Sequence, residues 1–194
     1  MDAQADILTR YPVPRHRLTI QDYHRLGEAG VLGPNDRVEL LEGLLVDMSP
    51  IGPRHALVVD RLYAWLFRAF DGQAWIRAQN PVVLDDGSEP QPDFSLLRPH
   101  WDGYPAEHPR PADIFLLIEV SDTSLAFDRG PKLEIYARAG VREVWIVDLT
   151  TNAVLVHRHP SGAGYASETR VVAPAVLEVE ALPGPTIPVH GLFF

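Results

Sequence analysis

The amino-acid sequence predicts an α/β fold, a mixed sheet flanked by helices, and three observations carry this prediction. Residues 114–121 form an almost wholly apolar run, as expected of a strand that is buried on both faces. Residues 131–140 read as a short helix with proline in its first turn and glycine at its end. Residues 144–148 form the next apolar run, and the order strand, helix, strand predicts a right-handed parallel crossover.

The composition fits a single globular domain, which we expect to span residues 18–194. A chain of 194 residues with 46% hydrophobic content is long enough to bury a substantial core. The absence of cysteine excludes disulfides, thiolate metal sites and a cysteine nucleophile. The sequence contains neither an apolar run of membrane-spanning length nor a signal-peptide pattern, so we expect a cytoplasmic protein with no membrane partner.

The amino-terminal part of the chain is expected to contain a tail and one capped helix. Residues 1–17 mix prolines, charges and a few apolar side chains without a period, which indicates a flexible tail. Thr19 can cap a helix over residues 20–29, with Asp22 three positions later and Gly30 after the last turn.

A hairpin is predicted next, from the apolar runs at residues 37–41 and 44–48 around a tight turn at Glu42 and Gly43. Glu42 at the turn is most simply solvated. Glu39 lies inside the first strand, and two interpretations remain open for it. It is either a polar residue on the exposed face of an edge strand or a third acid that faces a metal site.

Pro53 begins a long helix that is expected to continue to about residue 70, where Asp71 and Gly72 end it. Four apolar residues at helical spacing form its predicted buried stripe: Val59, Leu62, Leu66 and Phe70. His55 falls on this stripe, so it is expected to point toward the sheet. It is either a structural histidine or an auxiliary residue of a functional site.

Further strands are predicted on both sides of the central crossover, at residues 74–79, 81–84, 93–97, 153–159 and 165–172. The last two make a carboxyl-terminal hairpin that extends the sheet. Gln79 is either a polar strand residue or one that reaches the site. His100 and His108 have no partners at ligand spacing, so no metal cluster is predicted between residues 98 and 113.

Two acids and one lysine are the candidate functional residues. Asp93 stands at the entry of one strand, and Glu119 lies in a buried strand, where an ionised carboxylate is costly unless a cation or strong donors compensate it. Lys132 is the only lysine among 17 basic residues, which indicates a need for a compact ammonium rather than a planar guanidinium, although coding bias also explains the arginines. Ligands of open α/β sheets bind at the carboxyl ends of the strands, where Glu119 and Lys132 are expected to meet.

These residues carry a family resemblance. The set of Pro92-Asp93, Glu119-Val120-Ser121 and Lys132 resembles the PD-(D/E)xK nuclease superfamily, the restriction-endonuclease-like fold. The superfamily places its lysine two residues after the acid, where this chain has Ser121. More narrowly, the chain is similar over roughly residues 18–172 to the bacterial Uma-type family of endonucleases, which takes its lysine from the following helix. The matching positions are residues 39–43, Ser49-Pro50, His55, Lys132, Tyr136, Gly140, Glu143, Trp145 and residues 147–148.

The resemblance implies a metal-dependent endonuclease that hydrolyses DNA, with Asp93, Glu119 and Lys132 as catalytic residues and with Glu39 and His55 beside them. Asp93 and Glu119 supply the hard oxygen ligands that Mg²⁺ or Mn²⁺ prefers. The backbone carbonyl of Val120, and Glu39 through water, are expected to complete the metal site.

Three alternatives remain open: a buried ion pair without chemistry, a catalytically silent nucleic-acid or protein-interaction module that keeps the fold, and hydrolysis of another phosphoester. A formal charge of −9 argues against broad electrostatic binding of nucleic acid, so any contact to DNA must be local, metal-assisted or shared across an oligomer. We therefore expect a homodimer, with the amino-terminal helix and the apolar carboxyl end as candidate surfaces.

Overall fold

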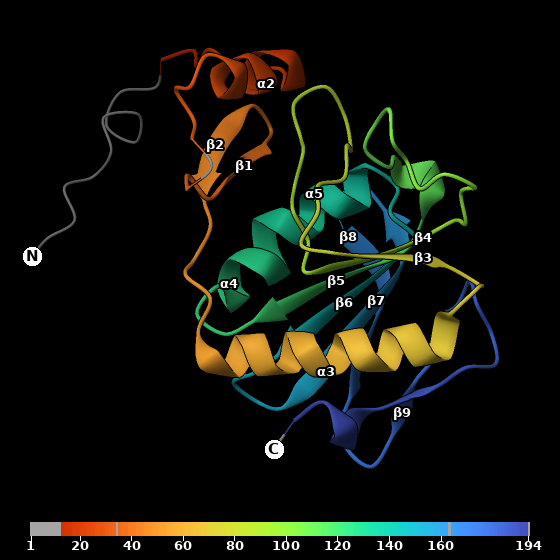
Figure 1. The fold of residues 1–194 in the computed structure, drawn as a ribbon. Coiled ribbons are helices and arrows are strands. Elements are labelled where there is room, and N and C mark those ends of the chain that lie inside the picture. Colours follow the sequence, from red (N-terminus) through yellow and green to blue (C-terminus); the bar gives the residue numbers. More distant parts are fainter. Residues whose placement is uncertain (1–12, 34, 163, 194) are drawn as a thin grey trace, which may run out of the picture.

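The computed structural model describes residues 13–33, 35–162 and 164–193, and its centre is a six-stranded mixed sheet (Figure 1). The strand order is β3-β4-β5-β6-β7-β8. The bounds are β3 (Trp75–Ala78), β4 (Phe94–Leu97), β5 (Ile114–Ser121), β6 (Glu143–Asp148), β7 (Ala153–Ser161) and β8 (Gly164–Val171). The predicted fold class and the carboxyl-terminal hairpin, β7 with β8, are confirmed. Most of the predicted tail, residues 1–12, lies outside the described residues.

The strands β5 and β6 pair in parallel, and the other neighbours in this sheet pair antiparallel. In the parallel pair Glu119 lies opposite Ile146, and Ser121 lies opposite Asp148. β4 runs antiparallel to β5, so the start of β4 lies at the sheet edge where β5 ends. This topology brings Asp93, just before β4, next to the end of the strand that carries Glu119.

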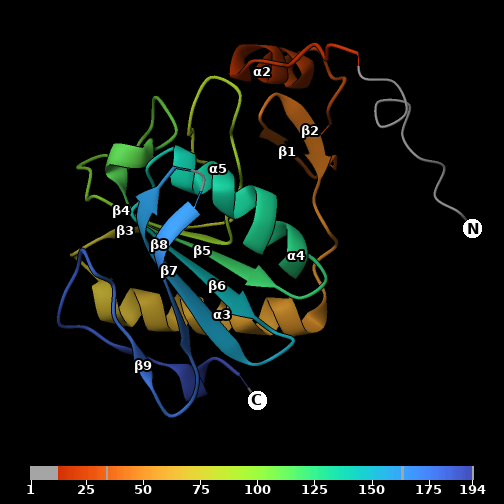
Figure 2. The ribbon, with the colours of Figure 1, turned by 180° about the vertical axis from the view of Figure 1, so that it is seen from behind.

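Helix α3 (Pro53–Phe70) covers one face of the sheet, as both views show (Figures 1 and 2). Its bounds agree with the prediction, because Pro53 suits the first turn and needs no hydrogen-bond partner for a backbone N–H. The buried stripe comprises Val58, Leu62, Leu66 and Phe70, whereas Val59 is only half-buried. This stripe packs with Phe94, Leu116, Ile118 and Trp145 in the larger of two cores.

The opposite face is covered by a helical segment that differs from the prediction. It consists of α4 (Leu125–Phe127), a π-helical turn η2 (Asp128–Lys132) and α5 (Leu133–Arg138). The helix was expected to begin at Pro131, but helical turns begin at Leu125. Gly130 lies outside helical dihedral angles, and Pro131 lacks an N–H and crowds the preceding turn, so the regular ladder is interrupted there. Both Asp128 and Lys132 are buried in this turn.

The hairpin forms a small sheet of its own rather than an edge of the main sheet. It comprises β1 (Val38–Leu41) and β2 (Leu44–Asp47), with helix α2 (Ile20–Glu28) beside it. The predicted capping box at the start of α2 is present. Gly43 has a φ of +75°, and a Cβ there would come within 2.5 Å of the Cβ of Arg17, so only glycine fits the turn. Glu39 is 4% exposed, which contradicts its interpretation as a residue on an exposed strand face.

Residues 81–84 do not continue the main sheet, contrary to the prediction. The backbone N–H of Val82 donates to Pro90 O, and that of Leu84 donates to Ser88 O. The chain leaves the sheet because Gln79 has a left-handed φ of 51° and Pro81 lacks the N–H that a ladder needs.

The carboxyl end of the chain belongs to the core. β9 (Val176–Leu177) pairs with β10 (Ile187–Pro188), and the short helix η3 (Val189–Gly191) follows. Ile187, Val189 and Leu192 are buried in the same core as α3. The apolar carboxyl end therefore covers the larger core and is not available as a dimer surface. Among the described residues, no helix is both long and apolar enough to cross a membrane.

Candidate active site

A cleft of about 450 Å³ lies where β5 ends, between the β2–α3 connection and the η2 turn. The five residues selected from the sequence line it together: Glu39, His55, Asp93, Glu119 and Lys132. They come from β1, α3, the position just before β4, β5 and η2, so segments far apart in the chain converge at one edge of the sheet. The cleft thus unites the acids, the lysine and the histidine of the sequence-based hypothesis.

Lys132 is held between two carboxylates at the centre of this arrangement. Its Nζ lies 3.0 Å from Glu39 Oε2 and 3.1 Å from Glu119 Oε1. Burial lowers the pKa of Lys132, but the charges of Glu119 and Glu39 outweigh burial and raise the pKa above its ordinary value. The side chain is therefore an ammonium at neutral pH, although the residue is only 4% exposed.

Glu119 is equally buried, and only one of its oxygens receives donors from the protein. Tyr136 donates its hydroxyl to Oε1, the oxygen that also meets Lys132. No described residue donates a hydrogen bond to Oε2. The pKa of Glu119 is raised to about 8. Burial is the largest cause, and together with the negative charges of Asp128, Asp93 and Glu39 it outweighs the lowering effect of Lys132.

Asp93 is fixed by three neighbours. Its Oδ2 accepts a hydrogen bond of 2.8 Å from the backbone N–H of Val120 and lies 3.1 Å from His55 Nε2. Its Oδ1 accepts a hydrogen bond of 3.2 Å from Gln79 Nε2. Burial lowers the pKa of His55, but the hydrogen bond and charge of Asp93 outweigh burial and raise it overall. Groups on β5, on α3 and next to the end of β3 therefore orient the carboxylate of Asp93.

The structure also decides whether Gln79 and Glu42 belong to the site. Gln79 reaches the site, because it donates to Asp93 from the end of β3. Glu42 does not reach it. Its carboxylate pairs with Arg17 and Arg138 at the exposed turn, as its solvated interpretation predicts.

Two residues of the site were missed from the sequence. Tyr136 orients Glu119, and Asp128 lines the cleft, where its Oδ2 accepts hydrogen bonds from Ser121 Oγ at 2.7 Å and Ser124 Oγ at 2.6 Å. Asp128, Lys132 and Tyr136 are spaced by four, so they share one side of a helical segment. The spacing was hidden for Asp128 because the helix was expected to begin only at Pro131, whereas Tyr136 lay in the predicted helix but was given no role in the site.

The carboxylate oxygens of the cleft suit a hard divalent cation. Within the described residues, no three His, Cys, Asp or Glu side chains converge in the arrangement of a complete metal site. Mg²⁺ is nevertheless held in many proteins by one or two carboxylates, with water as its other ligands. Asp93 and Glu119 line the same cleft, and Oε2 of Glu119 has no hydrogen-bond donor among the described residues. These two carboxylates fit such a partly hydrated cation.

Three comparisons with known proteins bear on this site. A family model, Uma2, described as "Putative restriction endonuclease", matches residues 20–190. A crystal structure of a putative nuclease belonging to DUF820 from Anabaena variabilis is 15% identical, with a TM-score of 0.68 over 91% of this chain and 97% of that chain. At that identity the likeness shows the fold alone. A search of curated proteins finds no match.

Proposed function

The chain belongs to the Uma2 family, and on that premise we propose that it is a metal-dependent endonuclease that hydrolyses DNA phosphodiester bonds. Family membership by itself supports a nuclease-like function. The observation that carries the finer proposal is the buried ammonium of Lys132, held by Glu39 and Glu119 in a cleft that also contains Asp93. Two carboxylates that can hold a metal ion, together with an ammonium, are sufficient for metal-assisted phosphodiester hydrolysis.

Lys132 is proposed to stabilise the negative charge that grows on the phosphate in the transition state. An ammonium in a cleft with little water interacts with such charge more strongly than one in bulk water. Glu39 and Glu119 hold the ammonium in place, and Tyr136 restrains Glu119. The protein thus positions its cation before the substrate arrives, so little reorganisation is needed during the reaction.

Asp93 and Glu119 would hold Mg²⁺ or Mn²⁺, together with the backbone carbonyl of Val120 and with Glu39 through water. When bound, the cation would supply a water of lowered pKa and neutralise charge on the phosphate. His55 would act on Asp93, since its Nε2 lies 3.1 Å from Oδ2 and fixes the direction of that carboxylate. Its raised pKa favours the protonated imidazole, which donates this hydrogen bond.

A second candidate is a catalytically silent module that retains the fold, and one observation favours it. The charged groups of the cleft satisfy one another: Lys132 meets two carboxylates, and Asp93 meets three protein groups. A network of this kind can be structural, and breaking it would then affect stability rather than chemistry. Hydrolysis of another phosphoester would use the same groups and is distinguished only by its substrate.

We include a homodimer in the proposal, because a chain with a formal charge of −9 has little surface on which to hold duplex DNA alone. Helix α2 is the remaining candidate surface, since it has no buried residue. A cytoplasmic location is part of the same proposal. Sedimentation that shows a monomer at micromolar concentration, with full cleavage activity, would contradict the dimer.

The decisive experiment is a cleavage assay with purified protein on supercoiled, linear and single-stranded DNA, in Mg²⁺, Mn²⁺ or EDTA. We expect cleavage in the presence of either metal and none in EDTA or with Lys132→Ala. A matched control is Arg129→Ala, which removes an exposed arginine of the same turn that pairs with Glu168 and does not line the cleft. If wild-type protein that is folded and loaded with metal cleaves no DNA substrate, the DNA endonuclease is excluded, and a test on other phosphoesters separates the silent module from another hydrolase.

A further inference from the structure

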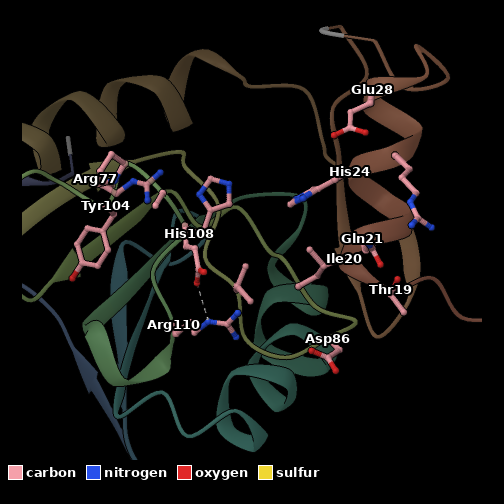
Figure 3. Close-up of a pocket in the computed structure, with 15 residues that line it drawn as sticks. Thr19, Ile20, Gln21, His24, Glu28, Arg77, Asp86, Tyr104, His108 and Arg110 are labelled. Carbon is pink, nitrogen blue, oxygen red and sulfur yellow. Dashed lines mark ion pairs between the residues drawn. The ribbon is translucent and has the colours of Figure 1, made fainter.

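A second and larger cleft, of about 860 Å³, lies between α2 and the loop that follows β4 (Figure 3). It shares no lining residue with the candidate active site. Thr19, Ile20 and His24 of α2 and its cap face Arg77, Tyr104 and His108 across the opening. Its volume lies within the range of clefts that bind small molecules.

Arg77 is the unusual cation of this cleft. Arg25 and Arg110 also line it, but each has a carboxylate neighbour, Asp22 at 3.7 Å and Glu107 at 3.8 Å. Among the described residues no carboxylate pairs with Arg77. Its Nη2 donates to Asn80 Oδ1 at 3.2 Å, and its buried Nη1 has no acceptor in the described part of the protein. That atom is closed to solvent, so the reason to expect an anion is different: a half-buried guanidinium lines the cleft without a carboxylate partner among the described residues.

A second unsatisfied group lies at the same place in the sheet. Arg77 on β3 is directly opposite Ser95 on β4. Ser95 is 1% exposed, and its Oγ also has no partner among the described residues. Both atoms are closed to solvent and Ser95 does not line the cleft, so a ligand in the cleft would not contact them and would meet only the exposed part of Arg77.

The surroundings of Arg77 indicate the kind of anion. Burial lowers the pKa of His108, and Arg77 and His24 lower it further against the opposing charge of Glu89, so His108 is neutral at pH 7 and Arg77 is the permanent charge. Tyr104 supplies an aromatic ring, and apolar atoms come from Ile20 and Val83. The cleft therefore offers one cation beside an aromatic and apolar surface.

The carboxylates of the cleft limit how much negative charge a ligand can carry. Glu28, Asp86 and Glu107 also line the cleft. Their negative charge would repel a long polyanion such as duplex DNA, whereas a ligand with a single phosphate could place it on Arg77.

We propose that this cleft binds a small phosphorylated ligand of mononucleotide size, with its phosphate on the guanidinium of Arg77 and its ring against Tyr104. The proposal does not depend on nuclease activity. Phosphate suits Arg77 because the guanidinium can donate two parallel hydrogen bonds to it.

Calorimetric titration tests the proposal, with adenosine monophosphate, adenosine and inorganic phosphate as probes in EDTA. We expect the mononucleotide to bind wild-type protein, the nucleoside to bind at least tenfold more weakly, and Arg77→Gln to weaken mononucleotide binding roughly 10- to 100-fold. Arg110→Gln is the matched control, because it removes an arginine of the same cleft that already has a carboxylate partner, and it should keep wild-type affinity.

Asp93→Asn separates this cleft from the candidate active site, since it should bind the mononucleotide as wild-type protein does. If Asp93→Asn instead loses binding and Arg77→Gln keeps it, the ligand occupies the active site and the proposal is overturned. Absence of mononucleotide binding to wild-type protein would overturn it as well. Should Arg77→Gln fail to fold, the side-chain Nε–H resonance of Arg77 in wild-type protein must shift on addition of the mononucleotide.

Discussion

Glu119 and Glu143 are both buried glutamates on neighbouring parallel strands, and each is paired with a cation, yet their surroundings differ. Glu143 is 1% exposed and receives donors on both oxygens. Its Oε1 accepts from Trp145 Nε1 at 2.7 Å and from Arg158 Nη2 at 2.8 Å, and its Oε2 accepts from the backbone N–H of Glu180 at 2.8 Å. Glu119 receives donors on Oε1 alone and faces a cleft.

The difference separates two uses of a buried charge. The carboxylate of Glu143 is satisfied by the protein, so it links β6, β7 and the carboxyl-terminal segment and has no oxygen left for a ligand. Glu119 keeps an oxygen without a protein donor, and burial raises its pKa to about 8. An incompletely satisfied buried charge is costly for stability, and residues of this kind are concentrated at functional sites.

The largest effect is expected when Lys132, the cation that pairs with Glu119, is replaced. Lys132→Ala should lower the rate of DNA cleavage by a factor on the order of 10²–10³, as loss of a transition-state donor does. Lys132→Arg should restore little activity, because the guanidinium is longer and planar and cannot occupy the same point. Single-turnover cleavage with saturating metal is the measurement.

Thermal unfolding of the same variants shows whether Lys132 is structural instead. A structural ion pair would tolerate arginine, and its alanine variant would chiefly lose stability. Wild-type cleavage by stably folded Lys132→Ala protein would exclude Lys132 from the catalytic residues.

Removal of Arg158, the cation that pairs with Glu143, should lower stability and leave activity unchanged. Arg158→Ala leaves a buried carboxylate without its charged donor, so it should lower the free energy of unfolding by about 3 kcal/mol. Activity per folded molecule should not change. Urea unfolding followed by fluorescence checks this, and Arg129→Ala is the control, because an exposed pair contributes less than about 1 kcal/mol. An equal loss of stability in both variants would contradict the contrast between the two glutamates.

Metal affinity should also differ between the surroundings of Glu119 and those of Glu143. Asp93→Asn removes a proposed ligand beside Glu119 and should weaken Mn²⁺ binding roughly tenfold or more. Glu143→Gln, whose oxygens all face protein donors, should leave Mn²⁺ affinity unchanged. Titration calorimetry measures both, and equal affinity in wild-type and Asp93→Asn protein would remove Asp93 from the metal site.

The last prediction concerns the dependence of stability on pH. Because the pKa of Glu119 rises from 4.5 to about 8 on folding, the folded protein holds one more proton than the unfolded chain between these values. The free energy of unfolding should therefore fall as pH rises from 4.5 to 8, in EDTA. Glu119→Gln should abolish this slope, and thermal unfolding across the range measures it.

Asp148→Asn is the control for the pH series. Burial raises the pKa of Asp148, but hydrogen bonds from Thr150 and Thr151 outweigh burial and lower the pKa below its ordinary value of 3.8. Asp148 therefore titrates below the pH range of the measurement, and its removal should leave the slope intact. A slope that persists in Glu119→Gln protein would show that another group carries it.

The elements that the sequence predicted well are those with local causes. α3 begins and ends at the predicted residues because Pro53, the apolar period and Asp71-Gly72 act within the segment itself. β5 and β6 were identified because strands that are covered on both faces must be apolar throughout, and the two cores confirm that cover. The choice of Asp93, Glu119 and Lys132 also came from the sequence, since each departs from its local pattern.

Only the tertiary structure decided which groups these residues meet. Glu39 is 93 positions from Lys132 in the chain, and nothing local indicates that β1 delivers it to the ammonium. The interruption of the helix near Pro131 was also not predictable, because a π-helical turn depends on packing as much as on local propensity. Arg77 and Ser95 likewise looked ordinary until β3–β4 pairing placed two unsatisfied atoms opposite each other. Sequence patterns report the environment of one residue, whereas satisfaction of a buried charge depends on partners that only the folded chain brings into reach.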